Sequence, residues 1–147
     1  MVREIPESGK AALLAITVFA AVAALLAGAM ILTPLPGPGT VRSVSLQVDG
    51  PGWSIDYAAD ATANRTAFAL LLEAADRLRF EVSWTSYSAP LDSVLVDSIN
   101  GTRSGDGGFW WLYWVDGRYG DVGADRKVLS DGSDVLWAFR TYPPTEG

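Results

Sequence analysis

Hydrophobic and polar residues alternate along several short segments of the chain, and this alternation predicts a protein rich in strands. A period of two places successive side chains on opposite faces, as a half-buried strand requires. Two of the segments are followed by pairs that form tight turns, Asn100-Gly101 and Asp116-Gly117. The predicted strands are Val41–Val48, Trp53–Tyr57, Phe80–Thr85, Val94–Ile99, Phe109–Val115, Arg126–Leu129 and Val135–Arg140.

One segment, Arg65–Arg79, follows a helical period instead. Its apolar residues recur three or four positions apart and form a single stripe, with charged residues on the other side. Asn64 or Thr66 can cap its start. One helix among several strands predicts an α+β fold, a mainly antiparallel sheet with one packed helix. A single helix covers only part of one sheet face, so the opposite face needs another cover or must tolerate water.

A long apolar run precedes these elements. Residues 11–32 are apolar apart from Thr17 and Gly28. As a helix they would span roughly 33 Å, about the thickness of the hydrocarbon core of a membrane. The run favours an uncleaved transmembrane signal-anchor helix. A cleaved signal peptide, with residues 27–29 as the cleavage site, is the alternative.

The apolar run divides the chain into parts. Arg3 and Lys10 precede it, and the next base is Arg42, which favours an N-terminus inside the cell and a domain outside. We therefore expect a single-pass protein of the cell membrane whose soluble domain lies outside the cytoplasm. The expected parts are a cytoplasmic tail (1–10), the membrane helix (11–32), a Pro/Gly linker (33–40), one domain (41–142) and a short tail (143–147).

Composition removes several classes of chemistry. The chain has no cysteine and no histidine, and its net charge is −6. Disulfides, Cys/His zinc sites and His-based catalytic triads are therefore excluded. Nucleic acid is not an expected partner, because clustered bases that neutralise phosphates are missing. Neither a carboxylate pair nor a serine motif stands out, and the turn aspartates do not follow the EF-hand spacing, so we expect no catalytic residues and no bound metal.

The segment 107–120, GGFWWLYWVDGRYG, concentrates aromatic residues. Strand periodicity places Trp111 and Tyr113 on one face, and Trp110 and Trp114 on the other. A central strand buried on both faces would explain this composition. An exposed platform for a flat ligand, a glycan or a protein partner is a second explanation, because such rings favour sites where one end stays wet. Membrane contact is a third explanation. If the rings form an exposed platform, one ring set packs under the helix and the other stays free.

Several stretches together resemble a known domain. They are AFALLLEAA, VDSING, GFWWLYWVDG and GADRKVLSDGSDVLW. The pattern resembles the small β-grasp-like domain at the C-terminus of transcobalamin and intrinsic factor, which also occurs in prokaryotic surface proteins as a domain of unknown function. The resemblance covers about residues 41–142. It implies a β-grasp-like fold, export with a membrane tether, and a corrinoid as a candidate ligand.

Two functions follow as expectations. The first is a membrane-anchored binding module outside the cytoplasm, which holds a small flat, corrinoid-like ligand or a glycan on its aromatic face. The second is an accessory or structural subunit of a larger surface or membrane assembly, with protein partners. The candidate ligand-binding residues are Trp110, Trp111, Tyr113, Trp114, Tyr119 and Tyr87. Asn64 and Asn100 begin glycosylation sequons, although a helix cap and a turn are the alternative roles for these residues.

Overall fold

The computed structural model describes residues 39–144. The predicted cytoplasmic tail, the apolar run 11–32 and most of the linker lie outside the described residues. Between residues 39 and 144, the structure contains no helix that is both long enough and apolar enough to cross a membrane.

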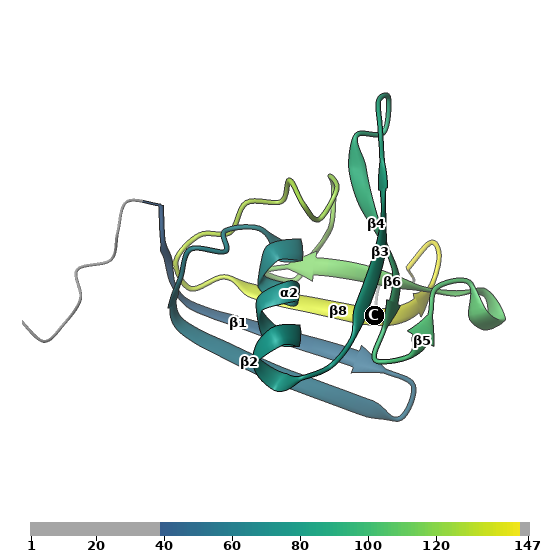
Figure 1. Cartoon of the computed structure of the whole chain (residues 1–147), viewed down its shortest axis with the longest axis horizontal. Helices are drawn as coiled ribbons and strands as arrows, with labels where there is room; N and C mark the ends of the chain where they lie inside the picture. The colour runs from purple at the N-terminus through teal and green to yellow at the C-terminus, as the bar shows by residue number, and fades with distance from the viewer. Residues whose placement is uncertain (1–38, 145–147) are drawn as a thin grey trace, which may run out of the picture. The chain divides into compact units, whose positions relative to one another are not determined.

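Five strands form the main sheet, in the order β2-β1-β8-β6-β7 (Figure 1). Every neighbouring pair is antiparallel except β1 and β8, which run parallel. The expectation of a mainly antiparallel sheet is therefore confirmed. The strands are β1 Val41–Gly50, β2 Trp53–Thr62, β6 Phe109–Val115, β7 Arg118–Tyr119 and β8 Asp134–Thr141.

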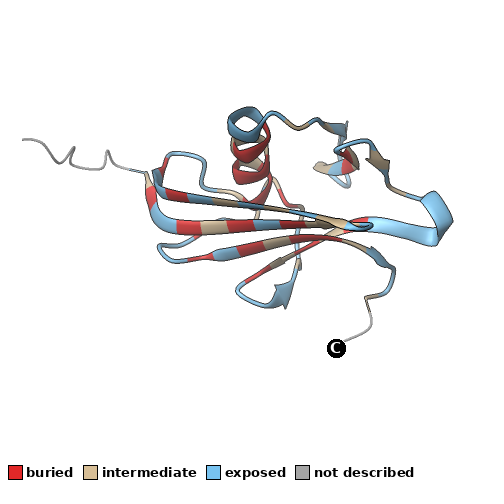
Figure 2. Cartoon of the chain, turned by 90° about the horizontal axis from the view of Figure 1, so that it is seen from below, coloured by how far each residue is buried: buried red, intermediate tan, exposed pale blue. Residues whose placement is uncertain are grey.

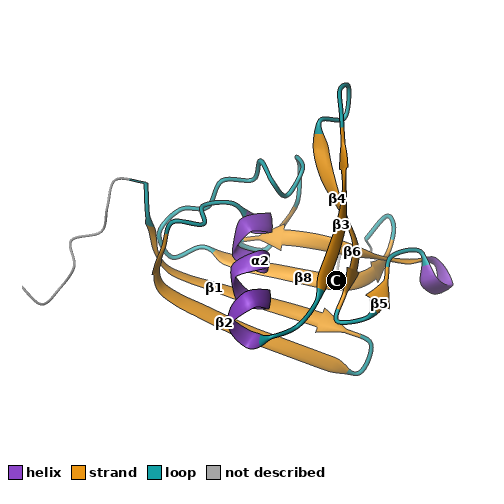
Figure 3. Cartoon of the chain, in the orientation of Figure 1, coloured by secondary structure: helices purple, strands orange, loops and turns teal. Residues whose placement is uncertain are grey.

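The single long helix, α2 (Ala67–Leu78), lies across one face of this sheet (Figure 3). Thr66 is its N-cap, and the Thr66 hydroxyl accepts a hydrogen bond from the backbone N–H of Ala69 at 3.1 Å. The helix ends at Arg79, whose left-handed conformation lets its N–H bond to the carbonyl oxygen of Ala75. The predicted helix is thus correct, shortened at each end by its caps. Leu70 and Leu71 of this helix are fully buried.

A second, three-stranded sheet crosses the same side of the main sheet (Figures 1 and 3). Its strands are β3 Val82–Tyr87, β4 Ser93–Ile99 and β5 Thr102–Arg103, and the short 3-10 helix η1, Asp106–Gly108, follows them. Val96 and Ile99 of β4 are buried in the core, and Trp84 of β3 meets Phe68 of the helix edge to face, with ring centroids 5.3 Å apart. The helix and this second sheet therefore together cover one face of the main sheet.

The core lies between the main sheet and these covering elements, as the band of buried positions in Figure 2 shows. Along β1, Val44, Leu46 and Val48 are buried, whereas the residues between them are not. The opposite face of the main sheet carries neither a helix nor a second sheet among residues 39–144. Within the described residues, this face is therefore exposed to water.

One predicted strand is absent from the structure. The segment 126–129 is a loop with one isolated bridge between Thr66 and Val128. Its backbone is used by the start of the helix instead: the N–H of Ala67 donates to the carbonyl of Lys127 at 3.1 Å, and the N–H of Leu129 to that of Arg65 at 2.8 Å. The segment 126–129 thus bonds to the start of the helix, where an N–H group has no partner within the helix, and not to a neighbouring strand.

The Thr66 cap gives a first prediction. Thr66→Ala is expected to lower the free energy of unfolding by about 1 kcal/mol, because the N–H of Ala69 loses its acceptor at the buried end of the helix. Thr66→Ser keeps the hydroxyl and should stay within about 0.5 kcal/mol of the unmodified chain. Urea unfolding followed by far-ultraviolet circular dichroism measures both; equal losses for the two variants would contradict the capping role.

Candidate functional site

The two faces of β6 have different environments. Trp111 and Tyr113 are buried, with 4% and 8% of their surface exposed, whereas Trp110 is 40% exposed and Trp114 is partly exposed. The indole N–H of Trp111 donates to the carbonyl of Thr102 at 2.9 Å, and its ring lies 5.3 Å from that of Phe139. The prediction that these two pairs of rings lie on opposite faces is therefore confirmed.

Both buried rings form hydrogen bonds with elements other than the helix. The Tyr113 hydroxyl donates to the carbonyl of Val122 in the loop after β7, and the Trp111 indole reaches β5. Burial raises the pKa of Tyr113 to about 12, and the negative charge of Asp121 adds to the increase. Trp111 and Tyr113 are core residues, so we remove them from the candidate ligand-binding set. Their polar tips are satisfied within the protein.

The exposed face of the main sheet carries a row of side chains that crosses all five strands. Backbone pairing joins Asp56 to Gln47, Gln47 to Leu136, Leu136 to Trp114, and Trp114 to Tyr119. Directly paired residues point to the same face of a sheet. Polar residues occupy the β2–β1 end of this row, and apolar or aromatic residues occupy the β8–β7 end. The open face is therefore amphipathic from one edge to the other.

An open groove of about 730 Å³ lies over this row and the row next to it, which contains Ala58, Ser45 and Asp134. Short side chains at Ala58 and Ser45 leave space above the backbone, while the Trp114 ring stands at the aromatic side. The turn between β6 and β7 contributes Gly117, at a position with φ of 75°. Both Asp116 and Gly117 have positive φ, as a tight hairpin turn requires. The groove is within the size range of small-ligand sites.

The polar groups of the groove leave mainly acceptor atoms free. Ser45 donates its hydroxyl hydrogen to Asp134, and Gln47 donates one amide hydrogen to Asp49 at 3.0 Å. The carboxylate of Asp56 is exposed and has no hydrogen-bond or ion-pair partner in the described part of the chain. Asp56 and Asp134 are the charged residues of the described chain that line the groove, and no lysine or arginine among residues 39–144 accompanies them there.

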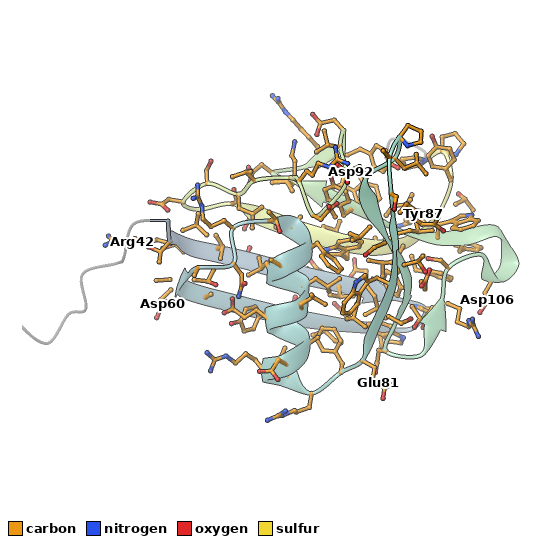
Figure 4. All side chains as sticks on the ribbon, turned by 45° about the horizontal axis from the view of Figure 1, so that its top comes forward. Arg42, Asp60, Glu81, Tyr87, Asp92 and Asp106 are labelled. Carbon is orange, nitrogen blue, oxygen red and sulfur yellow. The ribbon has the colours of Figure 1, made fainter. Side chains whose placement is uncertain are left out.

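The remaining predicted residues occupy different places. Tyr119 is on the same open face and meets the Trp114 ring edge to face, 5.5 Å between centroids. Partial burial raises the pKa of Tyr119, and Tyr142 adds to the increase. Trp110 is on this face but at the opposite end of β6, outside the groove lining. Tyr87 lies on the β3–β4 hairpin, 43% exposed, on the covered side of the sheet (Figure 4). Of the predicted residues, the groove lining thus contains Trp114 alone; Tyr119 packs against the Trp114 ring beside the groove, and Trp110 and Tyr87 lie elsewhere.

The two sequon asparagines differ in how free their side chains are. The amide nitrogen of Asn64 donates to Glu73 at 2.7 Å, so it takes part in the contact between the helix and β2. Asn100 is exposed in the turn between β4 and β5, with φ of 47°. The alternative role of Asn100 as a turn residue is therefore confirmed, whereas Thr66 rather than Asn64 caps the helix.

Four residues of the groove were not predicted: Asp56, Gln47, Asp134 and Leu136. They come from three strands and share no motif, so only the strand register brings them together. One signal was available for the first pair. The turn at Asp49–Gly52 predicts a hairpin between β1 and β2, and the hairpin register places Gln47 beside Asp56. Within residues 39–144, no three His, Cys, Asp or Glu side chains converge as metal ligands would.

Fold and groove together define the chain's class: a small α+β domain, with a five-stranded mixed sheet covered on one face and hollowed on the other. Solved structures share this fold. A proposed metal-binding protein from Ruminococcus gnavus ATCC 29149 matches with a TM-score of 0.54 and 17% identity, over 68% of this chain and 97% of that one. Haptocorrin in complex with Cbi matches with a TM-score of 0.57 and 17% identity, over 70% of this chain but only 25% of haptocorrin.

The sequence adds the particular family. The model of DUF4430, a domain of unknown function, matches residues 64–141, which is more than half of the chain, and the chain belongs to this family. No curated protein matches it. The likeness to haptocorrin, a member of the transcobalamin family, confirms the predicted resemblance. At 17% identity, these structural matches establish the fold and leave the ligand to be argued from the groove.

Proposed function

We propose that this chain is a non-catalytic binding module that holds a small flat ligand or a glycan in the groove on the open face of its main sheet. The observation that carries the proposal is the row from Asp56 to Trp114, in which the Trp114 ring, packed against Tyr119, stands opposite polar groups across a hollow of about 730 Å³. Aromatic faces stack on flat rings and on the apolar faces of sugars, while carboxylates accept hydrogen bonds from ligand donors.

The setting of this module is part of the proposal. A signal-anchor helix at residues 11–32 would tether the domain outside the cytoplasm by a linker of few residues. The parallel pair β1/β8 at the centre of the sheet, with one helix across it, supports a β-grasp-like architecture. The chemistry of the groove also supports a non-catalytic role, because its two carboxylates have no histidine, cysteine or base beside them.

Trp114→Ala tests the groove. The substitution is expected to weaken ligand binding at least about tenfold, equivalent to roughly 1.4 kcal/mol, because it removes the ring at the aromatic side. The measurement is quenching of tryptophan fluorescence in the full chain, kept in mild detergent, during titration with a corrinoid and with neutral oligosaccharides.

Trp110→Ala is the matched control, since it removes the same ring from the same face outside the groove. It should bind as the unmodified chain does. Equal weakening by both substitutions, or no saturable response to any probe, would refute the groove as the binding site.

A second function, accessory subunit of a surface assembly, has its own support. The β3–β4 hairpin exposes Tyr87, Leu91 and Leu95 at 43%, 65% and 39%, an apolar group on a projecting element. Exposed apolar groups of this kind are typical of protein contacts. Mild detergent extraction from native membranes followed by mass measurement distinguishes the two functions: a stable complex that is lost in the Leu91→Asp variant favours the accessory role.

A further inference from the structure

The charge of the groove narrows the ligand class. Among residues 39–144, its charged lining consists of Asp56 and Asp134 without a base, and the whole chain carries a net charge of −6. The two carboxylates would repel an anionic ligand, and their charge would not attract a neutral ligand. A cation is attracted by the same field. The electrostatics of the groove therefore favour a positively charged ligand.

The hydrogen-bonding capacity of the groove indicates the same ligand charge. Ser45 and Gln47 each direct a side-chain donor at a carboxylate of the protein itself. The carboxylate of Asp56 and the second oxygen of Asp134 remain as acceptors. Apart from the indole N–H of Trp114 and the second amide N–H of Gln47, the groove thus offers acceptors to a ligand, and the ligand that satisfies them is rich in donors. An ammonium group supplies three donors and a positive charge.

The arrangement of Asp134 and Trp114 provides a specific place for such a group. Trp114 pairs with Leu136, and Asp134 is two residues before Leu136 on the same face, so Trp114 and Asp134 are diagonal neighbours, roughly 7–8 Å apart at their Cα atoms. A cation between them can contact the carboxylate and the face of the indole together, and tryptophan is the most favourable ring for this contact. Hydrogen bonds from Ser45, and from the backbone of Asp134 to Asp116, hold the position of this aspartate.

Asp56 sets the length of the ligand. It lies three strands from Trp114 along the same row, which corresponds to roughly 14 Å at the usual strand spacing. One small cation cannot reach both ends. A chain of rings with several ammonium groups can stack the apolar face of one ring on Trp114 and also bond to Asp56.

We infer that the groove takes an oligosaccharide of amino sugars whose amines are free, and therefore protonated. One ring stacks on Trp114 with its ammonium group against Asp134, and a further ammonium group meets Asp56. This inference rests on the proposed function of the groove and specifies its ligand. Acetylation of the amines removes the charge and leaves the rings in place, so the inference predicts a preference for the free amine.

The experiment compares two probes that differ in this feature alone, a trimer of glucosamine and a trimer of N-acetylglucosamine. Binding to the full chain in mild detergent is measured by calorimetry at low ionic strength. The glucosamine trimer is expected to bind at least about tenfold more tightly. The preference should shrink as salt rises from roughly 0.05 to about 0.5 M, because screening weakens exposed charge pairs.

Matched variants locate the effect. Asp56→Asn removes one charge at a residue with no described partner, and it should reduce the preference about threefold or more. Asp76→Asn removes the same charge on α2, across the sheet from the groove, and should leave the preference unchanged. Equal loss in the two variants would overturn the inference, because it would reflect net charge alone.

The remaining outcomes separate the inference from the proposed function. Equal binding of the two trimers, or tighter binding of the acetylated one, overturns the inference but keeps the groove as a binding site. Tri-lysine binding as tightly as the glucosamine trimer also overturns it, since charge without sugar rings would suffice. If neither trimer binds and a corrinoid binds in a Trp114-dependent manner, the inference fails alone. If no probe binds, the proposed function fails with it.

Discussion

Replacement of Trp111 by alanine is expected to lower the free energy of unfolding by about 3–5 kcal/mol, the usual cost of removing a large aromatic side chain from a core. The same replacement at the preceding residue, Trp110, should cost less than about 1 kcal/mol. Replacement of these two adjacent tryptophans should therefore lower the free energy of unfolding by very different amounts. The difference comes from the face of the sheet on which each ring lies.

The cost at Trp111 has three sources. Its ring is 4% exposed and packs against Trp53 and Phe139, with centroids 5.8 and 5.3 Å away. Its removal leaves a cavity between the main sheet and β5, and the surrounding structure can fill such a cavity only in part. The carbonyl of Thr102 also loses the indole donor. Trp110 is 40% exposed, so its replacement removes a ring that is already partly in contact with water.

Urea unfolding of the full chain in mild detergent, followed by far-ultraviolet circular dichroism, measures both variants. Trp111→Phe provides an intermediate case if the alanine variant does not fold, with an expected loss smaller than that of alanine because most of the ring volume remains. Equal losses for Trp110→Ala and Trp111→Ala would show that the burial assigned to the two faces of β6 is wrong.

Replacement of Glu73 by alanine is expected to lower the free energy of unfolding by about 2–3 kcal/mol. The carboxylate of Glu73 accepts hydrogen bonds from Tyr57 at 2.7 Å, from Asn64 at 2.7 Å, and from the hydroxyl of Thr62. Tyr57 and Thr62 belong to β2, and Glu73 belongs to α2. One charged side chain therefore joins the helix to the edge strand of the main sheet, and its loss leaves three donors without an acceptor.

The same contact makes stability depend on pH. Partial burial by itself raises the pKa of Glu73, but hydrogen bonds from Asn64, Thr62 and Tyr57, with Arg77 nearby, outweigh burial and hold this pKa below its usual 4.5. The folded pKa is depressed, so the stabilisation is fully present above about pH 4.5 and is lost as pH falls through the folded pKa. For Tyr57, burial and then Glu73 raise the pKa to about 12, so its hydroxyl remains a donor throughout this range.

Urea unfolding at several pH values between neutrality and pH 3 tests both statements. The unmodified chain should lose stability below about pH 4.5, and Glu73→Ala should lack that part of the loss. Asp76→Ala on the same helix is the control: its side chain is 79% exposed and forms an ion pair with Arg79 at 3.6 Å, so it should cost less than about 0.5 kcal/mol. An equal effect of the two alanine substitutions would contradict the role of Glu73 as a link between helix and sheet.

Local patterns predicted most of the elements of this fold. The strand Phe109–Val115 was predicted with its observed limits, and Thr66 was one of two predicted caps for the helix. Both depend on neighbours in sequence: side-chain alternation in one case, a hydroxyl three residues from its donor in the other. The prediction of a strand at residues 126–129 failed because the backbone groups of this segment bond to the start of the helix. The helix start lies roughly sixty residues away in sequence, so no local pattern encodes this contact.

The candidate site was predicted less completely. The sequence singled out Trp114 and Tyr119, but also Trp111 and Tyr113, which are in the core. It could not identify Asp56, Gln47 or Asp134, because they become neighbours of Trp114 only through the pairing of β2, β1, β8 and β6. The β1/β8 pair is parallel and joins residues about ninety positions apart, so no hairpin turn fixes its register.

The sequence by itself determined the α+β class, the two-sided character of the aromatic strand and the absence of cysteine and histidine chemistry. These properties depend on composition and on periods of two and 3.6 residues, which short stretches of chain express. Only the tertiary structure decided which ring set is free. That choice depends on where the covering elements pack: on the covered face Trp111 bonds to β5 and Tyr113 to the loop after β7, while Trp114 lies beside an open groove.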